Sequence, residues 1–124
     1  MAGHGTFGWN ELITPDTDGC GAFYGKLLGW TRRDMDMGTG NYTLFNNGAQ
    51  DVGGMMKPPA DGAGPSMWLA YVMVDDVDAR TAKVEGLGGK VMKAPFDIPG
   101  VGRISIVTDP AGAPIGLFTA AAEA

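Results

Sequence analysis

The chain carries few side chains able to do chemistry, and Glu11 is the most informative of them. It interrupts an apolar segment, residues 7–14, whose alternation predicts a strand with Glu11 on the same face as Trp9 and Ile13. A carboxylate on a buried face has a raised pKa unless it is paired. Glu11 could therefore act as a general base or anchor a cationic or hydroxylated ligand. The structural alternative is that it pairs with Arg103 or caps buried amides.

Three other reactive residues have equally clear alternatives. Tyr71 could face Glu11 as a second catalytic residue, or could be a core tyrosine with one hydrogen bond. Arg103 could receive an anionic group, or form an ion pair with Glu11 or Asp97. Cys20 has no histidine near it in the sequence, so we expect an inert buried thiol.

Aromatic and methionine side chains complete the candidate site, because ligand pockets are mostly apolar with a few placed polar groups. A methionine stripe is also a common gap-filler in cores, so both interpretations stay open for these residues. Trp68 and Trp30 are expected in the core or at an interface. The predicted catalytic residues are Glu11 and Tyr71, and the predicted ligand-binding residues are Trp9, Glu11, Tyr42, Met55, Tyr71, Met73, Met92 and Arg103.

The strands and helices that must position these residues occur in two repeats along the chain. Residues 7–56 and 67–118 repeat one order, an apolar strand, an acidic turn, a helix ending in Leu-Gly and glycine-punctuated strands, at an offset of roughly 60 residues. We divide the chain into a flexible leader, a first module, a linker and a second module, at residues 1–6, 7–57, 58–66 and 67–120. Each module is predicted to be βαβββ, which makes one α+β domain with mainly antiparallel sheets.

Local signals set the expected bounds of these elements. Asp16 or Thr17 is a plausible N-cap for a helix that ends at Gly29, with a wide apolar stripe, and Asn47-Gly48 predicts a hairpin. A turn is expected at residues 38–40 and a Pro- and Gly-rich loop at Pro95–Gly102. The expected strands are residues 7–14, 30–37, 42–46, 52–57, 67–74, 90–93, 103–108 and 114–119, and the second helix is expected at 75–87.

Composition excludes several classes of function. The chain has 124 residues, 44% of them hydrophobic, and a formal net charge of -5, which argues against nucleic acid and anionic membrane surfaces. No apolar run reaches the length of a membrane-spanning helix, and the first residues do not form a signal peptide. With a single cysteine there is no internal disulfide framework. We expect a soluble cytoplasmic protein.

Four segments, FYGKLLGW, VDDVDA, LGGKV and VTDPAGAPIGLF, resemble the vicinal oxygen chelate superfamily, which includes glyoxalase I, bleomycin-resistance proteins and extradiol dioxygenases. The resemblance implies two βαβββ modules that form a partly open, mostly antiparallel barrel around a central cavity. More narrowly, the chain resembles a glyoxalase-like subgroup related to a two-domain mycobacterial antigen.

The same resemblance implies where a metal would be held. The superfamily's ligand positions fall near Trp9 and Leu69 on the first strands, and near Gly54 or Met55 and at Gly116 on the last strands. None of these can ligate a divalent cation, and a catalytic metal needs about three donors. We therefore predict no metal and no cofactor.

Three functions remain open from the sequence. The first is binding of a small organic molecule in a metal-free cavity, as in the bleomycin-resistance members. The second is a metal-independent isomerase or lyase with Glu11 as general base and Tyr71 or Arg103 stabilising negative charge. The third is a regulatory or partner-binding module without small-molecule chemistry. Open sheet edges and an exposed apolar strand face also predict a homodimer.

Overall fold

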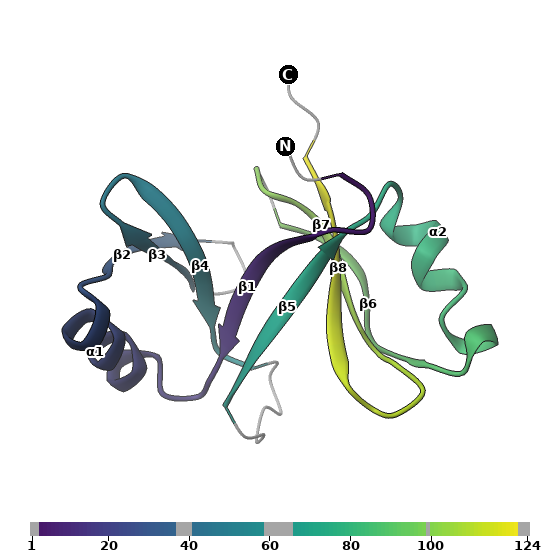
Figure 1. The fold of residues 1–124 in the computed structure, drawn as a ribbon, viewed down its shortest axis with the longest axis horizontal. Coiled ribbons are helices and arrows are strands. Elements are labelled where there is room, and N and C mark those ends of the chain that lie inside the picture. Colours follow the sequence, from purple (N-terminus) through teal and green to yellow (C-terminus); the bar gives the residue numbers. More distant parts are fainter. Residues whose placement is uncertain (1–2, 37–40, 59–65, 99, 122–124) are drawn as a thin grey trace. The chain divides into compact units, whose positions relative to one another are not determined.

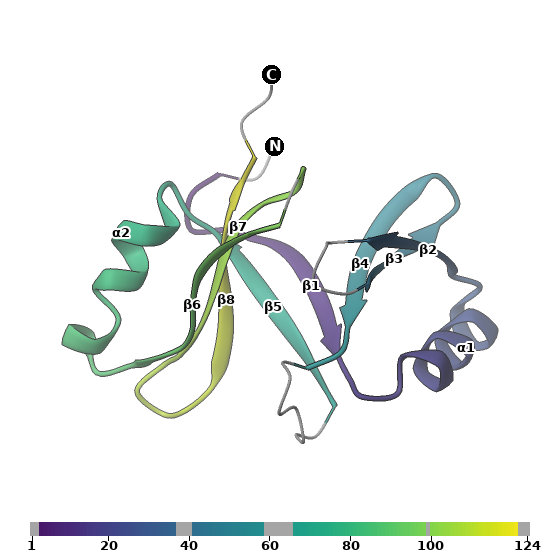
Figure 2. The same cartoon turned by 180° about the vertical axis from the view of Figure 1, so that it is seen from behind.

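The computed structural model describes residues 3–36, 41–58, 66–98 and 100–121. The chain divides into two compact units, Trp9–Leu69 and the combination of Met1–Gly8 with Ala70–Ala124 (Figure 1, and from behind in Figure 2). The predicted turn at residues 38–40, most of the linker and the first two leader residues lie outside the described residues. No helix in the described ranges is long and apolar enough to cross a membrane.

The first module has the predicted element order, and its strands lie in the order β2-β3-β4-β1. Strands β2, β3 and β4 are antiparallel, whereas β1 runs parallel to β4. The first and last strands of the module are therefore neighbours. The elements are β1 Phe7–Ile13, α1 Thr17–Leu28, β2 Thr31–Asp36, β3 Asn41–Asn47 and β4 Gln50–Met56.

The second module repeats this topology with the order β5-β8-β7-β6 and a parallel pair between β5 and β8. Strands β6, β7 and β8 are antiparallel. The α+β class and the two βαβββ modules are thus confirmed. The elements are β5 Met67–Met73, α2 Val77–Ala82, the 3-10 turn η1 Glu85–Leu87, β6 Lys90–Ile98, β7 Gly102–Thr108 and β8 Pro114–Ala120.

The first helix begins and ends near the residues predicted from the sequence, whereas the second helix is shorter than predicted. Asp16 accepts the Gly19 N–H at 2.9 Å as the N-cap, and Gly29 ends α1 with φ 76°. Asp76 caps α2 by accepting the Ala79 N–H at 3.1 Å. The helix predicted to run to residue 87 ends at Ala82, because the following Glu-Gly-Leu-Gly-Gly segment has poor helix propensity and tightens into η1.

The core of the first module lies between α1 and its sheet. Leu12, Phe45 and Met55 are at most 3% exposed. Cys20, Tyr24, Trp30 and Val52 pack against them, partly buried. The core places Leu12 and Met55 on the face of the sheet that α1 covers.

Two local expectations differ from the structure. The predicted loop at Pro95–Gly102 is strand as far as Ile98. Pro95 lies where the register with β7 shifts, between Lys93 and Phe96, so its missing N–H removes no bond from the regular ladder. The leader, expected to be flexible, pairs with β5, since Gly5 N–H donates to the Met73 carbonyl and Met73 N–H to the Thr6 carbonyl, both at 2.7 Å.

Candidate functional site

Glu11 lies at the closing strand pair of the first module. In the parallel register its Cα is opposite Gly54 of β4, and Leu12 is opposite Met55. Because successive strand residues point to opposite faces, Glu11 projects away from α1 while Leu12 packs toward it. The Glu11 side chain is nevertheless only 1% exposed. A carboxylate is thus buried on the sheet face that α1 does not cover.

The hydroxyl of Tyr42, on β3, is held between two partners. It donates to the Glu11 carboxylate and accepts the Trp9 Nε1–H at 2.8 Å. Burial raises the pKa of Tyr42 far above its ordinary value, and the negative charge of Glu11 raises it further. Tyr42 therefore stays protonated and donates to Glu11. We call Trp9, Tyr42, Glu11 and Gly54 the Glu11 network.

Gly54 belongs to this network because of the space it leaves. A Cβ added to Gly54 would lie 1.6 Å from the Tyr42 hydroxyl oxygen and 2.2 Å from its Cζ. Only glycine allows the tyrosine to reach Glu11 across β4. This role of Gly54 was not predicted from the sequence, although a glycine pair inside an apolar strand is a signal of close approach by another group.

Tyr71 occupies the corresponding position in the second module. Its Cα is opposite Gly116 of β8, and its ring fills the space of a Gly116 side chain, since a Cβ added to Gly116 would lie 2.3 Å from Tyr71 Cδ2. Tyr71 is 1% exposed. The predicted contact between Tyr71 and Glu11, and the catalytic role of both residues, stay predictions.

The three candidate methionines lie in different surroundings. Met55 is in the core with Leu12 and Phe45, Met73 is partly buried on β5 beside the leader, and Met92 is 64% exposed on β6. Within the first module, Met55 points to the face of the sheet opposite Glu11. Their predicted contact with a ligand stays a prediction.

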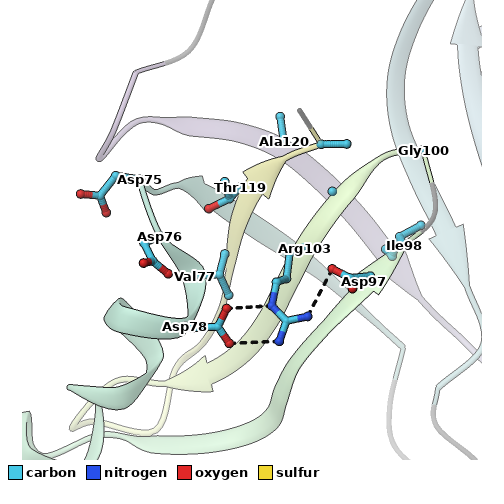
Figure 3. Close-up of a pocket in the computed structure, with 12 residues that line it drawn as sticks. Asp75, Asp76, Val77, Asp78, Asp97, Ile98, Gly100, Arg103, Thr119 and Ala120 are labelled. Carbon is cyan, nitrogen blue, oxygen red and sulfur yellow. Dashed lines mark hydrogen bonds and ion pairs between the residues drawn. The ribbon is translucent and has the colours of Figure 1, made fainter. Parts of the chain in front are cut away.

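Arg103 lies in an open hollow of about 420 Å³ in the second module, between the start of α2 and the ends of β6, β7 and β8 (Figure 3). Its Nε and Nη2 donate to the Asp78 carboxylate at 2.8 and 3.0 Å, and its Nη1 lies 3.2 Å from Asp97. These bonds raise the pKa of Arg103 and lower that of Asp78. Of the two ion-pair partners predicted for Arg103 from the sequence, Glu11 and Asp97, Asp97 is paired with it. The stronger partner, Asp78, was missed, because pairing of α2 with β7 is not visible in the sequence.

The other carboxylates at this hollow also have partners. Asp75 accepts two bonds from Arg80, at 2.9 and 3.0 Å, which lower the pKa of Asp75 to about 2. Asp76 is the N-cap of α2. The backbone N–H of Asp75 donates to His4 Nδ1 at 3.0 Å. The hollow is therefore a network of ion pairs and caps that fastens α2 and the leader to the second module.

The positions that the resemblance assigns to metal ligands in the first module carry other groups. At the positions that the resemblance assigns to metal ligands, Trp9 has no ligating atom, and the space of a Gly54 side chain is filled by Tyr42. Across the described ranges, no three or more His, Cys, Asp or Glu side chains are grouped so that they could hold a metal ion.

Comparison with known proteins decides the family. Residues 6–117 match the model of the Glyoxalase/Bleomycin resistance protein/Dioxygenase superfamily. The chain belongs to this superfamily. Over 110 residues it is 44% identical to the provisionally named glyoxylase CFP32 of Mycobacterium tuberculosis, covering 88% of this chain and 42% of that protein. It is 35% identical to the anthracycline biosynthesis protein DnrV of Streptomyces peucetius, covering 89% and 45%. The chain thus spans less than half the length of these relatives.

Solved structures share the fold at low sequence identity. Methylmalonyl-CoA epimerase from Mycobacterium tuberculosis superposes with a TM-score of 0.67 and 17% identity, covering 98% of this chain and 93% of the enzyme. A homoprotocatechuate 2,3-dioxygenase variant from B. fuscum gives a TM-score of 0.65 and 20% identity, covering 99% and 34%. At such identities the likeness supports the fold alone.

Proposed function

We propose that the protein binds a small organic molecule at the sheet face around the Glu11 network, without a metal. The observation that carries this proposal is the Glu11 carboxylate, 1% exposed and oriented by the Tyr42 hydroxyl. A buried, oriented carboxylate is suited to bind a hydroxyl or an amine, because charge-assisted hydrogen bonds are stronger than neutral ones. The partly exposed ring of Trp9 supplies apolar surface next to the Tyr42 hydroxyl that orients Glu11.

The names of the relatives suggest a class of ligand. Two are described as anthracycline biosynthesis proteins, and anthracyclines are fused aromatic molecules with hydroxyl and amino groups. Such a molecule matches an aromatic wall beside a carboxylate. We therefore propose a hydroxylated aromatic ligand, bound by stacking on Trp9 with one polar group on Glu11.

The test is a fluorescence titration of the protein with an anthracycline. Glu11→Gln keeps the shape of the side chain and removes its charge, so we expect binding to weaken about 10-fold or more. Asp18→Asn, which changes an exposed carboxylate on α1, is the matched control and should leave the affinity unchanged. Equal affinity in the Glu11 variant and the control, with both proteins folded by circular dichroism, would contradict the proposal.

A second candidate is a metal-independent isomerase, and the Tyr42 contact favours it. A base must be an acceptor held in one geometry, and Tyr42 donates to Glu11 rather than competing with it for protons. Glu11 would remove the proton from a hydroxyl-bearing carbon next to a carbonyl and return it to the former carbonyl carbon, while the hydroxyl proton passes to the former carbonyl oxygen, so no oxidant or reductant is required. The hemithioacetal of an α-ketoaldehyde is a suitable probe, given the glyoxylase name of one relative. Turnover that Glu11→Gln abolishes while affinity is kept would favour the enzyme over the binding protein.

A further inference from the structure

One row of residues crosses the first-module sheet on the face that α1 does not cover. In the strand registers Glu11 is opposite Gly54, and Gly54 is in turn opposite Leu44. Leu44 is opposite Arg33 of β2, which is the outer strand of the module. Residues that lie opposite one another in a sheet point to the same face, so all four share the face of Glu11. The row therefore begins with a carboxylate and ends with a guanidinium.

The Arg33 side chain extends over β3 toward β4. Its Nη2 lies 3.8 Å from a carboxylate oxygen of Asp51, which is on β4, two strands away from β2. Since β4 pairs with β1, the guanidinium is on the order of 10 Å from the position of Glu11. The half-buried Leu44 and the Tyr42 ring, which lies over β4, are the neighbouring side chains on this face. An acid and a base are thus separated by apolar groups on one face of one module.

Within the described residues the Arg33 guanidinium is only weakly engaged. A distance of 3.8 Å is too long for a hydrogen bond, and Asp51 already accepts one from the Asn46 side chain. Arg33 is also 59% exposed. By contrast, Arg80 and Arg103 each donate two bonds of 3.0 Å or less to an aspartate. Arg33 therefore keeps the planar fork of N–H donors that suits a carboxylate.

The equivalent row of the second module also ends in a cation. Tyr71 is opposite Gly116, and Gly116 is opposite Ile106. Ile106 is opposite Lys93, which lies on the outer strand β6 as Arg33 lies on β2. The chain has 14 acidic and only 9 basic residues, so a cation at the same row position of both modules favours a role in attracting an anion.

We propose that Arg33 binds a carboxylate of the ligand whose hydroxyl is bound by Glu11, so that the ligand is a hydroxylated aromatic acid. This role of Arg33 rests on the proposed function of the Glu11 network. A separation on the order of 10 Å matches a molecule of two or three rings with its polar groups at opposite ends. Arg33 attracts the carboxylate and Glu11 repels it, so the ligand binds in one orientation.

Titration with two aromatic compounds tests the role of Arg33. One is a hydroxynaphthoate with its hydroxyl and carboxylate at opposite ends of the fused rings, and the other is the naphthol that lacks the carboxylate. At neutral pH the wild-type protein should bind the hydroxynaphthoate about 5-fold or more tightly than the naphthol, through one charge-assisted pair at a partly exposed site. Arg33→Gln should remove this preference and leave the affinity for the naphthol unchanged.

Two further variants separate recognition of the anion from stability of the fold. Arg32→Gln is the matched control, because it removes the same charge from the next residue, which packs on Gly21 of α1 on the opposite face of the sheet. It should change neither affinity. Asp51→Asn removes the carboxylate that competes for Arg33, so the hydroxynaphthoate should bind about 2- to 3-fold more tightly and the naphthol as before. A purely structural Arg33 would give no such gain.

The possible results distinguish this role from the proposed function. Equal wild-type affinity for the two compounds, or the same loss with Arg32→Gln as with Arg33→Gln, would overturn the role of Arg33 and leave the Glu11 network as a binding site. Binding of neither compound would also overturn it. In that case the anthracycline titration with Glu11→Gln decides the proposed function separately. Circular dichroism checks that each variant keeps its fold.

Discussion

Replacing Gly54 by alanine is the sharpest test of the Glu11 network. The new methyl group would lie 1.6 Å from the Tyr42 hydroxyl oxygen, where an ordinary contact needs more than about 3 Å. The ring must therefore move by roughly 1.5 Å, which is enough to break both of its hydrogen bonds. One methyl group on β4 should detach Tyr42 from Glu11 and from Trp9.

The expected cost follows from these two bonds. A hydrogen bond to a charged group contributes about 1.5–3 kcal/mol and a neutral one about 0.5–1.5 kcal/mol. Replacing a glycine in a strand by alanine stabilises the fold by about 0.5 kcal/mol, because the unfolded chain has less conformational entropy to lose. We expect Gly54→Ala to lower the free energy of unfolding by roughly 1.5–4 kcal/mol.

Urea unfolding followed by tryptophan fluorescence measures this change. The adjacent Gly53→Ala is the control, because its new Cβ would lie 3.1 Å from the Asn10 carbonyl oxygen and needs only a small adjustment, at a cost within about 1 kcal/mol. In a Tyr42→Ala background the obstructing ring is gone, so Gly54→Ala should add less than about 1 kcal/mol. If Gly54→Ala costs no more than Gly53→Ala, or costs the same without Tyr42, the reasoning is wrong.

Three further predictions concern single contacts. Trp9→Phe removes the indole that donates to Tyr42 at 2.8 Å, so the urea midpoint should fall by an amount equivalent to about 1 kcal/mol. The pKa of Asp75 is lowered to about 2, so its ion pair stabilises the fold above its ordinary pKa and is lost as pH falls towards 2. Asp75→Asn should therefore lower the melting temperature at pH 6 but not at pH 2. Arg103→Met breaks the two bonds to Asp78, and the resulting fall in melting temperature should shrink in high salt, whereas anthracycline affinity should not change. A salt-independent fall would contradict an electrostatic role.

Sequence reasoning succeeded where the signal is local. Strand alternation put Glu11 and Trp9 on one face, and both contact Tyr42 there. The Asn47-Gly48 turn was predicted from its residue types, and Gly48 has the required positive φ of 64°.

The failures involve partners far apart in the chain. Tyr42 reaches Glu11 only because β3, β4 and β1 pair in one particular register, which no local pattern specifies. The apolar residues of α1 were predicted from their helical spacing, and they lie on the helix as predicted. Helical spacing alone does not say that Cys20 and Tyr24 pack on the core while Leu27 stays outside.

The parallel pair between β1 and β4 has a consequence for how the first module is made. Roughly forty residues separate Glu11 from Gly54, its partner across the pair. During synthesis β1 leaves the ribosome well before β4 is made, so β1 is unpaired for that time. Closing this long loop is then a slow, entropically costly step. A chain truncated before β4 would lack Gly54, the partner of Glu11 across the pair. Until β4 is synthesised, the incomplete module would be a target for chaperone binding and proteolysis.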